Sequence, residues 1–200
     1  GLYQKDKAGS TTQFFPWEGT LLPNPNGQLP SSRFIGEPGD YYNSERKTFG
    51  WQFEHKFNDN WTVRQNFRYA QNENANQYHY GAAFSGFDSW SSDPIFKRVL
   101  GRYFDNQLTL NRTQTLDNHV EGHFQTGAFK HTLLVGADFA RQRENVWSGT
   151  NVDTIDVYAP VYGHRDVPDA TALPRTRQRQ TGIYLQDQIK LDNWIFVAGL

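Results

Sequence analysis

The residues of this chain best suited to chemistry are two histidines and a glutamate spaced two apart, His119, Glu121 and His123. In an extended strand, residues two apart lie on one face, so the three side chains could be presented to one metal ion. The same geometry separates neighbouring side chains by about 6.8 Å, which is too wide for three ligands to converge on one ion. We interpret them as polar side chains of a strand face, and we expect no cofactor or metal bound by protein side chains.

Other signatures of catalysis are missing from the sequence. It has no cysteine and none of the G-x-S-x-G, H-E-x-x-H or phosphate-binding glycine patterns. The alternating carboxylates of residues 151–156 lack the glycine and the final glutamate of a calcium-binding loop. A formal net charge of −1 gives no reason to expect nucleic acid as a partner. We therefore expect a protein that is not an enzyme and binds no nucleic acid.

Apolar and polar residues alternate along the sequence with a period of two, most clearly over residues 48–70. Two arms, 48–57 and 61–70, alternate between apolar and polar residues around the turn formers Asn58–Asn60, and this pattern predicts a β-hairpin. The apolar positions are mostly aromatic: Phe49, Trp51, Phe53, Phe57, Trp61, Val63, Phe67 and Tyr69. In a soluble sandwich this face would be the core. In an outer-membrane barrel it would face lipid, and the face with Arg64 and Arg68 would line the lumen.

The spacing of turns and loops favours the barrel. The second arm is expected to continue to about Tyr78, and further strands are expected over residues 2–15, 104–125, 130–146, 175–190 and from 194 onward. Turns of about three residues (58–60, 126–128, 191–193) alternate with loops of about 25 to 28 residues (17–44, 79–103, 147–174). Such long loops are uncommon in compact soluble domains, whereas short turns at one end and long loops at the other are typical of outer-membrane barrels. The sequence predicts an all-β fold, an antiparallel transmembrane β-barrel.

The alternation also assigns faces in the later strands. Residues expected to face lipid are Val120, Phe124, Leu133, Val135, Ala137, Phe139, Ile183, Leu185 and Ile189. Their polar neighbours are expected to face the lumen, as Arg68 does beside the lipid-facing Phe67. Leu134 and Asp187 break this pattern.

Three segments resemble the barrel of TonB-dependent ferric-siderophore receptors, most closely the ferrichrome (hydroxamate) receptor type. They are WQFEHKFNDNWTVRQNFRYA (51–70), FQTGAFKHTLLVGADFARQR (124–143) and QRQTGIYLQDQIKLDNW (178–194), of which QTGIYLQDQ (180–188) is the most specific. The resemblance implies a plugged barrel of about 22 strands, of which residues 1–200 supply about seven and no plug. It implies a location in the outer membrane of a Gram-negative bacterium. The implied partners are a ferric siderophore, which brings the iron as its complex, the TonB complex acting through the plug, and outer-membrane lipid.

Aromatic residues gather where the expected strands meet the long loops: Phe14, Phe15, Trp17, Tyr78, Tyr80 and Trp147. They could form the aromatic girdle of a barrel or a mouth that grips a chelate. The resemblance, through the segments FFPWEG and NQYHYG, implies ligand binding for Phe14, Tyr78 and Tyr80, with Trp147 as a further candidate. Thr12 stands where the family would have another aromatic residue. Tyr78 and Tyr80 have the parity of Arg68, which indicates the lumen face.

Loop charge bears on the ligand. The three long loops carry nine acidic and five basic side chains, a net charge of −4. This charge would repel a strongly anionic ferric catecholate and suits a neutral or cationic ferric hydroxamate. The sequence therefore favours TonB-driven import of a ferric hydroxamate of the ferrichrome type. Import of a catecholate or cobalamin, and a structural or passive-pore barrel, stay open as alternatives.

Overall fold

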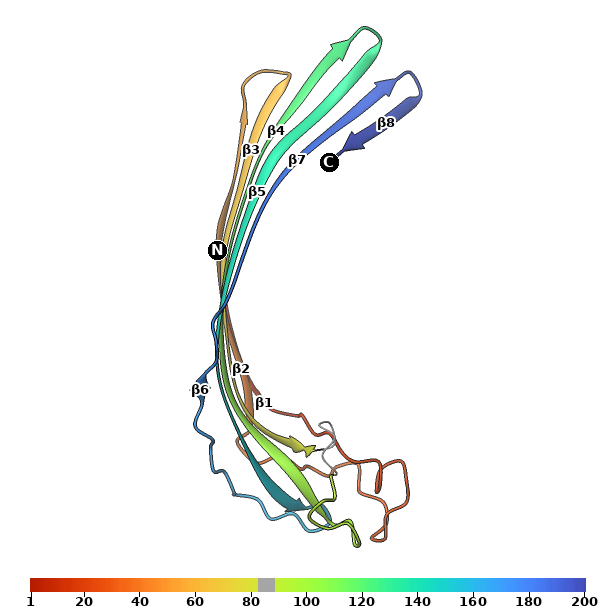
Figure 1. Cartoon of the computed structure of the whole chain (residues 1–200), viewed down its shortest axis with the longest axis vertical. Coiled ribbons are helices and arrows are strands. Elements are labelled where there is room, and N and C mark those ends of the chain that lie inside the picture. Colours follow the sequence, from red (N-terminus) through yellow and green to blue (C-terminus); the bar gives the residue numbers. More distant parts are fainter. Residues whose placement is uncertain (83–88) are drawn as a thin grey trace.

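A computed structural model describes residues 1–82 and 89–200 as one bowed antiparallel sheet (Figure 1). The strands are β1 (Leu2–Gly9), β2 (Tyr41–Lys56), β3 (Trp61–Gly81), β4 (Val99–Thr126), β5 (Phe129–Asp156), β6 (Thr171–Ala172), β7 (Thr176–Leu191) and β8 (Trp194–Gly199). Their order in the sheet is β1-β2-β3-β4-β5-β7-β8, and the short β6 pairs with β5. The predicted all-β, antiparallel fold is confirmed.

The short turns lie where the sequence places them, all at one end of the sheet (Figure 1). In the β2–β3 turn, the Asn58 carboxamide oxygen accepts hydrogen bonds from the amides of Asn60 (2.9 Å) and Trp61 (3.0 Å). This is the local bonding that makes asparagine a turn former. The β4–β5 turn uses Gly127 at φ 64°, and the β7–β8 turn uses Asp192 at φ 48°. Positive φ lets such tight turns match the twist of the strands they join.

The loop ends of the strands were predicted less well. β4 and β5 extend to Val99 and Asp156 rather than stopping near residues 104 and 146, and they keep one register along their whole length. β2 already begins at Tyr41 and β3 continues to Gly81, whereas β1 ends at Gly9 instead of Phe15. Sheet hydrogen bonds are made by the backbone, so pairing continues after the side-chain alternation has faded.

Every ladder keeps a constant register, so directly opposite residues share a face across the sheet. One such row runs through Trp51, Phe67, Leu116 and Phe139, and the next through Gln52, Asn66, Asp117 and Asp138. The aromatic and aliphatic rows form what we call the apolar band: Phe49, Trp51, Phe53, Val63, Phe67, Leu116, Val120, Val135, Ala137, Phe139, Ile183 and Leu185. The opposite, polar side is called the inner face. The predicted alternation is confirmed.

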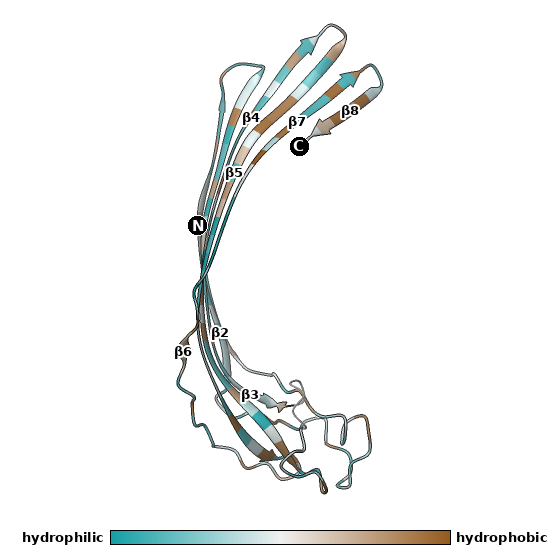
Figure 2. Ribbon diagram, in the orientation of Figure 1, coloured by the Kyte–Doolittle hydropathy of each residue, from teal (hydrophilic) through white to brown (hydrophobic). Residues whose placement is uncertain are grey.

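Among the residues that the structure describes, none forms a core beneath the apolar band. The exposed fractions of Phe53 and Ile183 are 53% and 78%, and hydrophobic colouring recurs along the strands (Figure 2). The structure shows where the two exceptions to the pattern lie, and an interaction across the strands accounts for Asp187. Leu134 lies on the inner face opposite Glu121. Asp187 lies on the band side, where its carboxylate meets the His131 ring at 2.7 Å.

The long connections pack together as a cap at the end of the sheet opposite the short turns (Figure 1). Its core joins residues from all three connections and the adjacent strand ends: Leu29, Ile35, Trp90, Leu100, Ile155 and Val157. Tyr158 and Tyr162 donate hydrogen bonds from their hydroxyls to the carbonyls of Gly27 and Phe34. Leu100 and Ile155 have the parity of the apolar band, so the core of the cap lies on that side of the strand ends.

Buried charges fasten the first connection to the strands. The Arg102 guanidinium bonds to the Ile35 carbonyl (2.8 Å) and to the carboxylates of Glu37 and Asp153. The Asp40 carboxylate accepts the His79 amide (2.8 Å) and lies 3.1 Å from the His79 ring nitrogen Nδ1. Burial opposes ionisation of Asp40, but the bonds from the His79 ring and two backbone amides outweigh it, so the pKa of this carboxyl is lowered.

Candidate functional site

At the cap end of the inner face, aromatic rings from three segments meet. Tyr78 and Tyr80 are neighbours on β3, with ring centroids 5.6 Å apart. Tyr103 of β4 lies opposite Tyr80, also at 5.6 Å, and Phe14 meets Tyr80 edge to face at 5.6 Å. We call Phe14, Tyr78, Tyr80 and Tyr103 the aromatic cluster. Three of the four residues expected to bind ligand are thus brought together.

Phe14 reaches the cluster through an unusual backbone. It adopts φ 45°, and the adjacent Gln13 carbonyl accepts a hydrogen bond from the Gly81 amide at 3.1 Å. A Cβ on Gly81 would lie 2.1 Å from the Phe14 carbonyl oxygen, so only glycine allows this approach. The β2–β3 ladder ends at Gln77, so the last residues of β3 have no partner from β2. The Gly81 hydrogen bond joins the first connection to this edge of β3.

Of the carboxylates in residues 1–82 and 89–200, that of Asp105 lies within the cluster. Asp105 is directly opposite Tyr78, accepts the Tyr80 hydroxyl at 3.1 Å and accepts the Thr150 hydroxyl at 2.7 Å. Burial and the negative charge of Asp105 raise the pKa of Tyr80, and the same two causes raise that of Tyr78. Both phenols therefore stay protonated at any physiological pH. They can donate hydrogen bonds to ligand oxygens while their rings present apolar faces.

Trp147 is not part of this arrangement. It lies within β5, opposite Leu108 and Ala172, and it has the parity of the apolar band. The expectation that residue 147 begins a loop is wrong, because β5 continues to Asp156. Of the other loop aromatics, Phe15 packs against the cap core and Trp17 is 68% exposed.

Sequence reasoning missed Tyr103 and Asp105. The sequence places Tyr103 at the end of the second long loop (79–103) and Asp105 near the start of the expected strand 104–125, and the alternation was followed only through the later residues of that strand. The available signal was the alternation of Tyr103, Asp105 and Gln107 with Phe104, continued backward from the clear part of β4. Tyr42, 49% exposed on the inner face of β2 opposite Asn76, was missed for the same reason.

His119 and His123 each lie beside a carboxylate of their own strand. His119 lies 2.9 Å from Asp117, and His123 lies 3.0 Å from Glu121, whose second oxygen accepts from Arg64 at 2.8 Å. Within residues 1–82 and 89–200 no group of three potential ligands is arranged to hold a metal ion.

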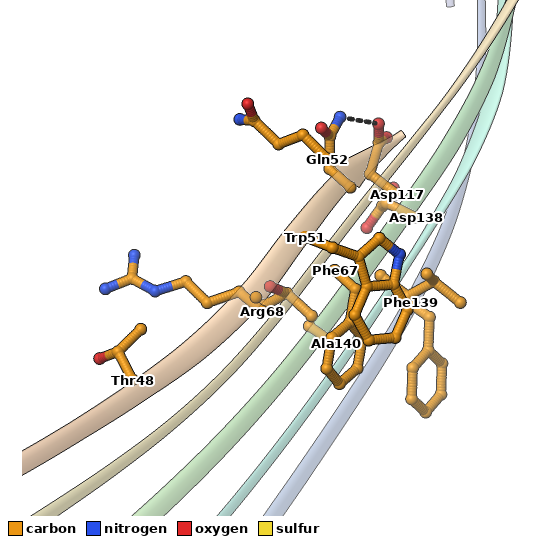
Figure 3. A pocket seen from close by; sticks show the side chains of 13 residues that line it. Thr48, Trp51, Gln52, Phe67, Arg68, Asp117, Asp138, Phe139 and Ala140 are labelled. Atoms are coloured by element: carbon orange, nitrogen blue, oxygen red, sulfur yellow. Dashed lines mark hydrogen bonds between the residues drawn. The ribbon is translucent and has the colours of Figure 1, made fainter. Parts of the chain in front are cut away.

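A hollow of about 760 Å³ at mid-sheet is a poorer candidate for a ligand site. Figure 3 shows Arg68 and Gln52 on one side of the strands and Trp51, Phe67 and Phe139 on the other. The hollow therefore combines both surfaces of the sheet and belongs to the wall itself. The aromatic cluster, which lies on one face and includes tyrosine hydroxyls beside the Asp105 carboxylate, is the better site.

The sequence matches the family described as "TonB dependent receptor-like, beta-barrel" over residues 2–200. The chain belongs to this family. It is 32% identical to the ferrichrome outer membrane transporter/phage receptor of Escherichia coli K12, covering 93% of this chain and 27% of that protein. It is also 32% identical to a ferrioxamine B receptor of Salmonella typhimurium LT2, covering 98% of this chain and 27% of the receptor. The chain thus spans about a quarter of the length of these relatives.

Solved structures agree on the fold. The siderophore receptor PiuA of Acinetobacter baumannii superposes with a TM-score of 0.72 over 98% of this chain and 31% of PiuA, at 19% identity. The open form of the E. coli ferric-catecholate import receptor Fiu gives 0.66 over 84% of this chain and 26% of Fiu. The sheet is therefore a part of a TonB-dependent receptor barrel. In the described residues, no helix has the length and apolar character needed to cross a membrane.

Proposed function

We propose that this chain is part of an outer-membrane receptor that imports a ferric siderophore, of the hydroxamate class, with energy from TonB. The observation that carries the proposal is the convergence of Phe14, Tyr78 and Tyr80, residues far apart in sequence, on the inner face beside the cap. The relatives named as ferrichrome and ferrioxamine B receptors support the ligand class. In this proposal the protein is a transport receptor and not an enzyme, and iron enters as the siderophore complex without a resident metal site.

The apolar band supports an outer-membrane location with lipid as a partner. Its rings and aliphatic side chains are uncovered on one surface, as in a barrel wall. Beyond the band, toward the cap, the same surface carries Arg112, Arg143 and Arg177 directly opposite one another on three strands. Like charges in such a row are unfavourable unless anions lie among them, and the headgroup region of a membrane supplies anionic groups.

The cluster suits a ferric hydroxamate because it offers both kinds of contact that such a ligand needs. The rings can pack against the apolar flanks of the chelate. The Tyr78 hydroxyl, which donates to no described protein group, can hydrogen-bond to the chelate's oxygens. The TonB complex and the plug act outside residues 1–200 in this proposal.

Replacing Tyr78 and Tyr80 together by alanine in the full-length receptor tests the site. We expect ferrichrome binding, followed by tryptophan quenching, to weaken by about 1–3 kcal/mol while barrel assembly is retained. Trp147→Ala is the control, because this ring lies on the other face and we expect it to leave binding unchanged. An unaltered dissociation constant in the double variant would remove both tyrosines from the site.

Two alternatives predict different results, one in the binding assay and one in an uptake assay. Tighter binding of a ferric catecholate than of ferrichrome would show that the ligand belongs to the catecholate class. Uptake that continues without TonB would indicate a passive pore. We favour the hydroxamate because the connections that form the cap are net negative, which disfavours a strongly anionic chelate.

A further inference from the structure

We propose that Asp105 makes the mouth of this receptor selective for ferric chelates that carry a positive charge, specifically those with a free alkylammonium group. The inference rests on the proposed function and narrows its ligand class. It assigns Asp105 a role in specificity that the aromatic residues do not have.

The first argument is the state of the Asp105 carboxylate. Its two oxygens accept hydrogen bonds from the neutral hydroxyls of Tyr80 and Thr150, and in the described part of the chain it forms no ion pair. The carboxylates of Glu37 and Asp153, by contrast, are both paired with the Arg102 guanidinium. Asp105 therefore presents a negative charge that the described residues leave uncompensated.

The second argument is what surrounds that charge. Tyr78 lies directly opposite Asp105 on β3, and Tyr80 and Tyr103 flank it on the same face. Tyr42 lies on that face one strand further, opposite Asn76. Aromatic ring faces attract cations, and a carboxylate among them adds direct charge attraction. Rings around a carboxylate are a suitable environment for an alkylammonium group.

The third argument is the charge of the inner face around the cluster. Asp6 of β1 lies on this face opposite Ser44, whose hydroxyl is 3.4 Å from the carboxylate. The first cation on the inner face of β2 is Arg46, opposite Asn72 and four residues along the strand from Tyr42, about 13 Å away. The inner face at the cluster is therefore net negative, in the same sense as the cap.

A purely structural role for Asp105 makes a different prediction. If the carboxylate only orients the Tyr80 hydroxyl, its charge does not matter, and every chelate is affected alike by a substitution. Asp105→Asn distinguishes the two roles, because an amide oxygen still accepts the Tyr80 hydrogen bond while the charge is gone. Asp105→Glu keeps the charge and serves as the matched variant.

The experiment compares two ligands that differ at one terminus: ferrioxamine B with its terminal ammonium, and the same chelate acetylated at that amine, which removes the positive charge. In the full-length receptor we expect the ammonium form to bind about tenfold more tightly. Asp105→Asn should reduce this ratio of dissociation constants toward one, and Asp105→Glu should keep most of it. Heat-modifiable migration of the barrel in electrophoresis verifies that each variant is assembled.

The outcomes separate this inference from the proposed function. Equal binding of the two chelates by the unaltered receptor, or an Asp105→Asn variant that keeps the full preference, would overturn the role of Asp105 and leave hydroxamate import standing. An equal loss for both chelates would assign Asp105 to the positioning of Tyr80 alone. A receptor that binds neither chelate nor ferrichrome would overturn the proposed function itself.

Discussion

Replacing one residue of the apolar band by arginine tests which face of the sheet meets lipid and which meets the lumen. Phe67 lies in the apolar band between Trp51 and Leu116 on the neighbouring strands. Asn66, the preceding residue, lies on the inner face between Gln52 and Asp117. Introducing arginine at either position adds the same side chain to adjacent points of β3, so any difference in stability reports the surroundings of the two faces.

The expected magnitudes follow from what each side chain touches. An arginine on the lipid face near the bilayer midplane costs about 2–4 kcal/mol. Phe67→Arg also removes a stacked contact with Trp51, with ring centroids 4.3 Å apart, worth about 0.5–1.5 kcal/mol. We expect a loss of about 3–5 kcal/mol in the free energy of unfolding. Asn66→Arg places the new cation beside Asp117 and should change stability by less than about 1 kcal/mol.

Equilibrium urea unfolding of the full-length receptor in lipid vesicles, followed by tryptophan emission, measures both values. Arg68→Gln on the inner face is a second control and should also cost little, because Arg68 lies opposite Gly50 and Thr115. A larger loss for Asn66→Arg or Arg68→Gln than for Phe67→Arg would refute the assignment of faces. That result would also refute the proposal that the apolar band lies against membrane lipid.

Two further predictions concern the cap and the isolated chain. Replacing Asp40 by asparagine should destabilise the cap by about 3–5 kcal/mol, because it removes one partner of a buried pair, and hydrogen exchange at the His79 amide should accelerate. The pKa of Asp40 is lowered from its ordinary 3.8, so its stabilisation is complete above that pH and is lost as pH falls through the lower folded value. A protection factor of the His79 amide that stays unchanged in acid would contradict this. Residues 1–200 expressed alone in water should associate instead of folding as a stable monomer, because β1 and β8 each leave an edge unpaired and the apolar band is uncovered. A cooperative monomer in sedimentation and thermal melting would argue for a soluble sheet.

The sequence predicted the strands best where one face is apolar. Around residues 48–70 the alternation is broken on the apolar face only at His55 and Gln65, and there the turn, the pairing and the facing all agree with the structure. The prediction weakened toward the cap because the strands there are polar on both faces. In β5, for example, residues 141–145 are all polar, yet the backbone ladder with β4 continues through them. Nothing in the side chains marks where such a ladder stops.

The residues of the candidate site were likewise predictable only where the alternation could be followed along a strand. Tyr78 and Tyr80 could be placed because parity counted from Phe67 stays valid as long as β3 contains no bulge, and its register with β4 is constant to Gly81. Trp147 could not be placed, because its parity matters only if β5 reaches it, and the polar residues before it conceal that.

Tyr103 and Asp105 show what a longer ladder adds to a site. Once β4 is known to begin at Val99, counting back from Asp117 puts both residues on the inner face. The register then sets Asp105 opposite Tyr78 and Tyr103 opposite Tyr80. A pair of tyrosines on one strand is thereby completed by a third ring and a carboxylate from the next strand. The length of the strands beyond the apolar band, which the alternation does not encode, is what places a charge within the aromatic cluster.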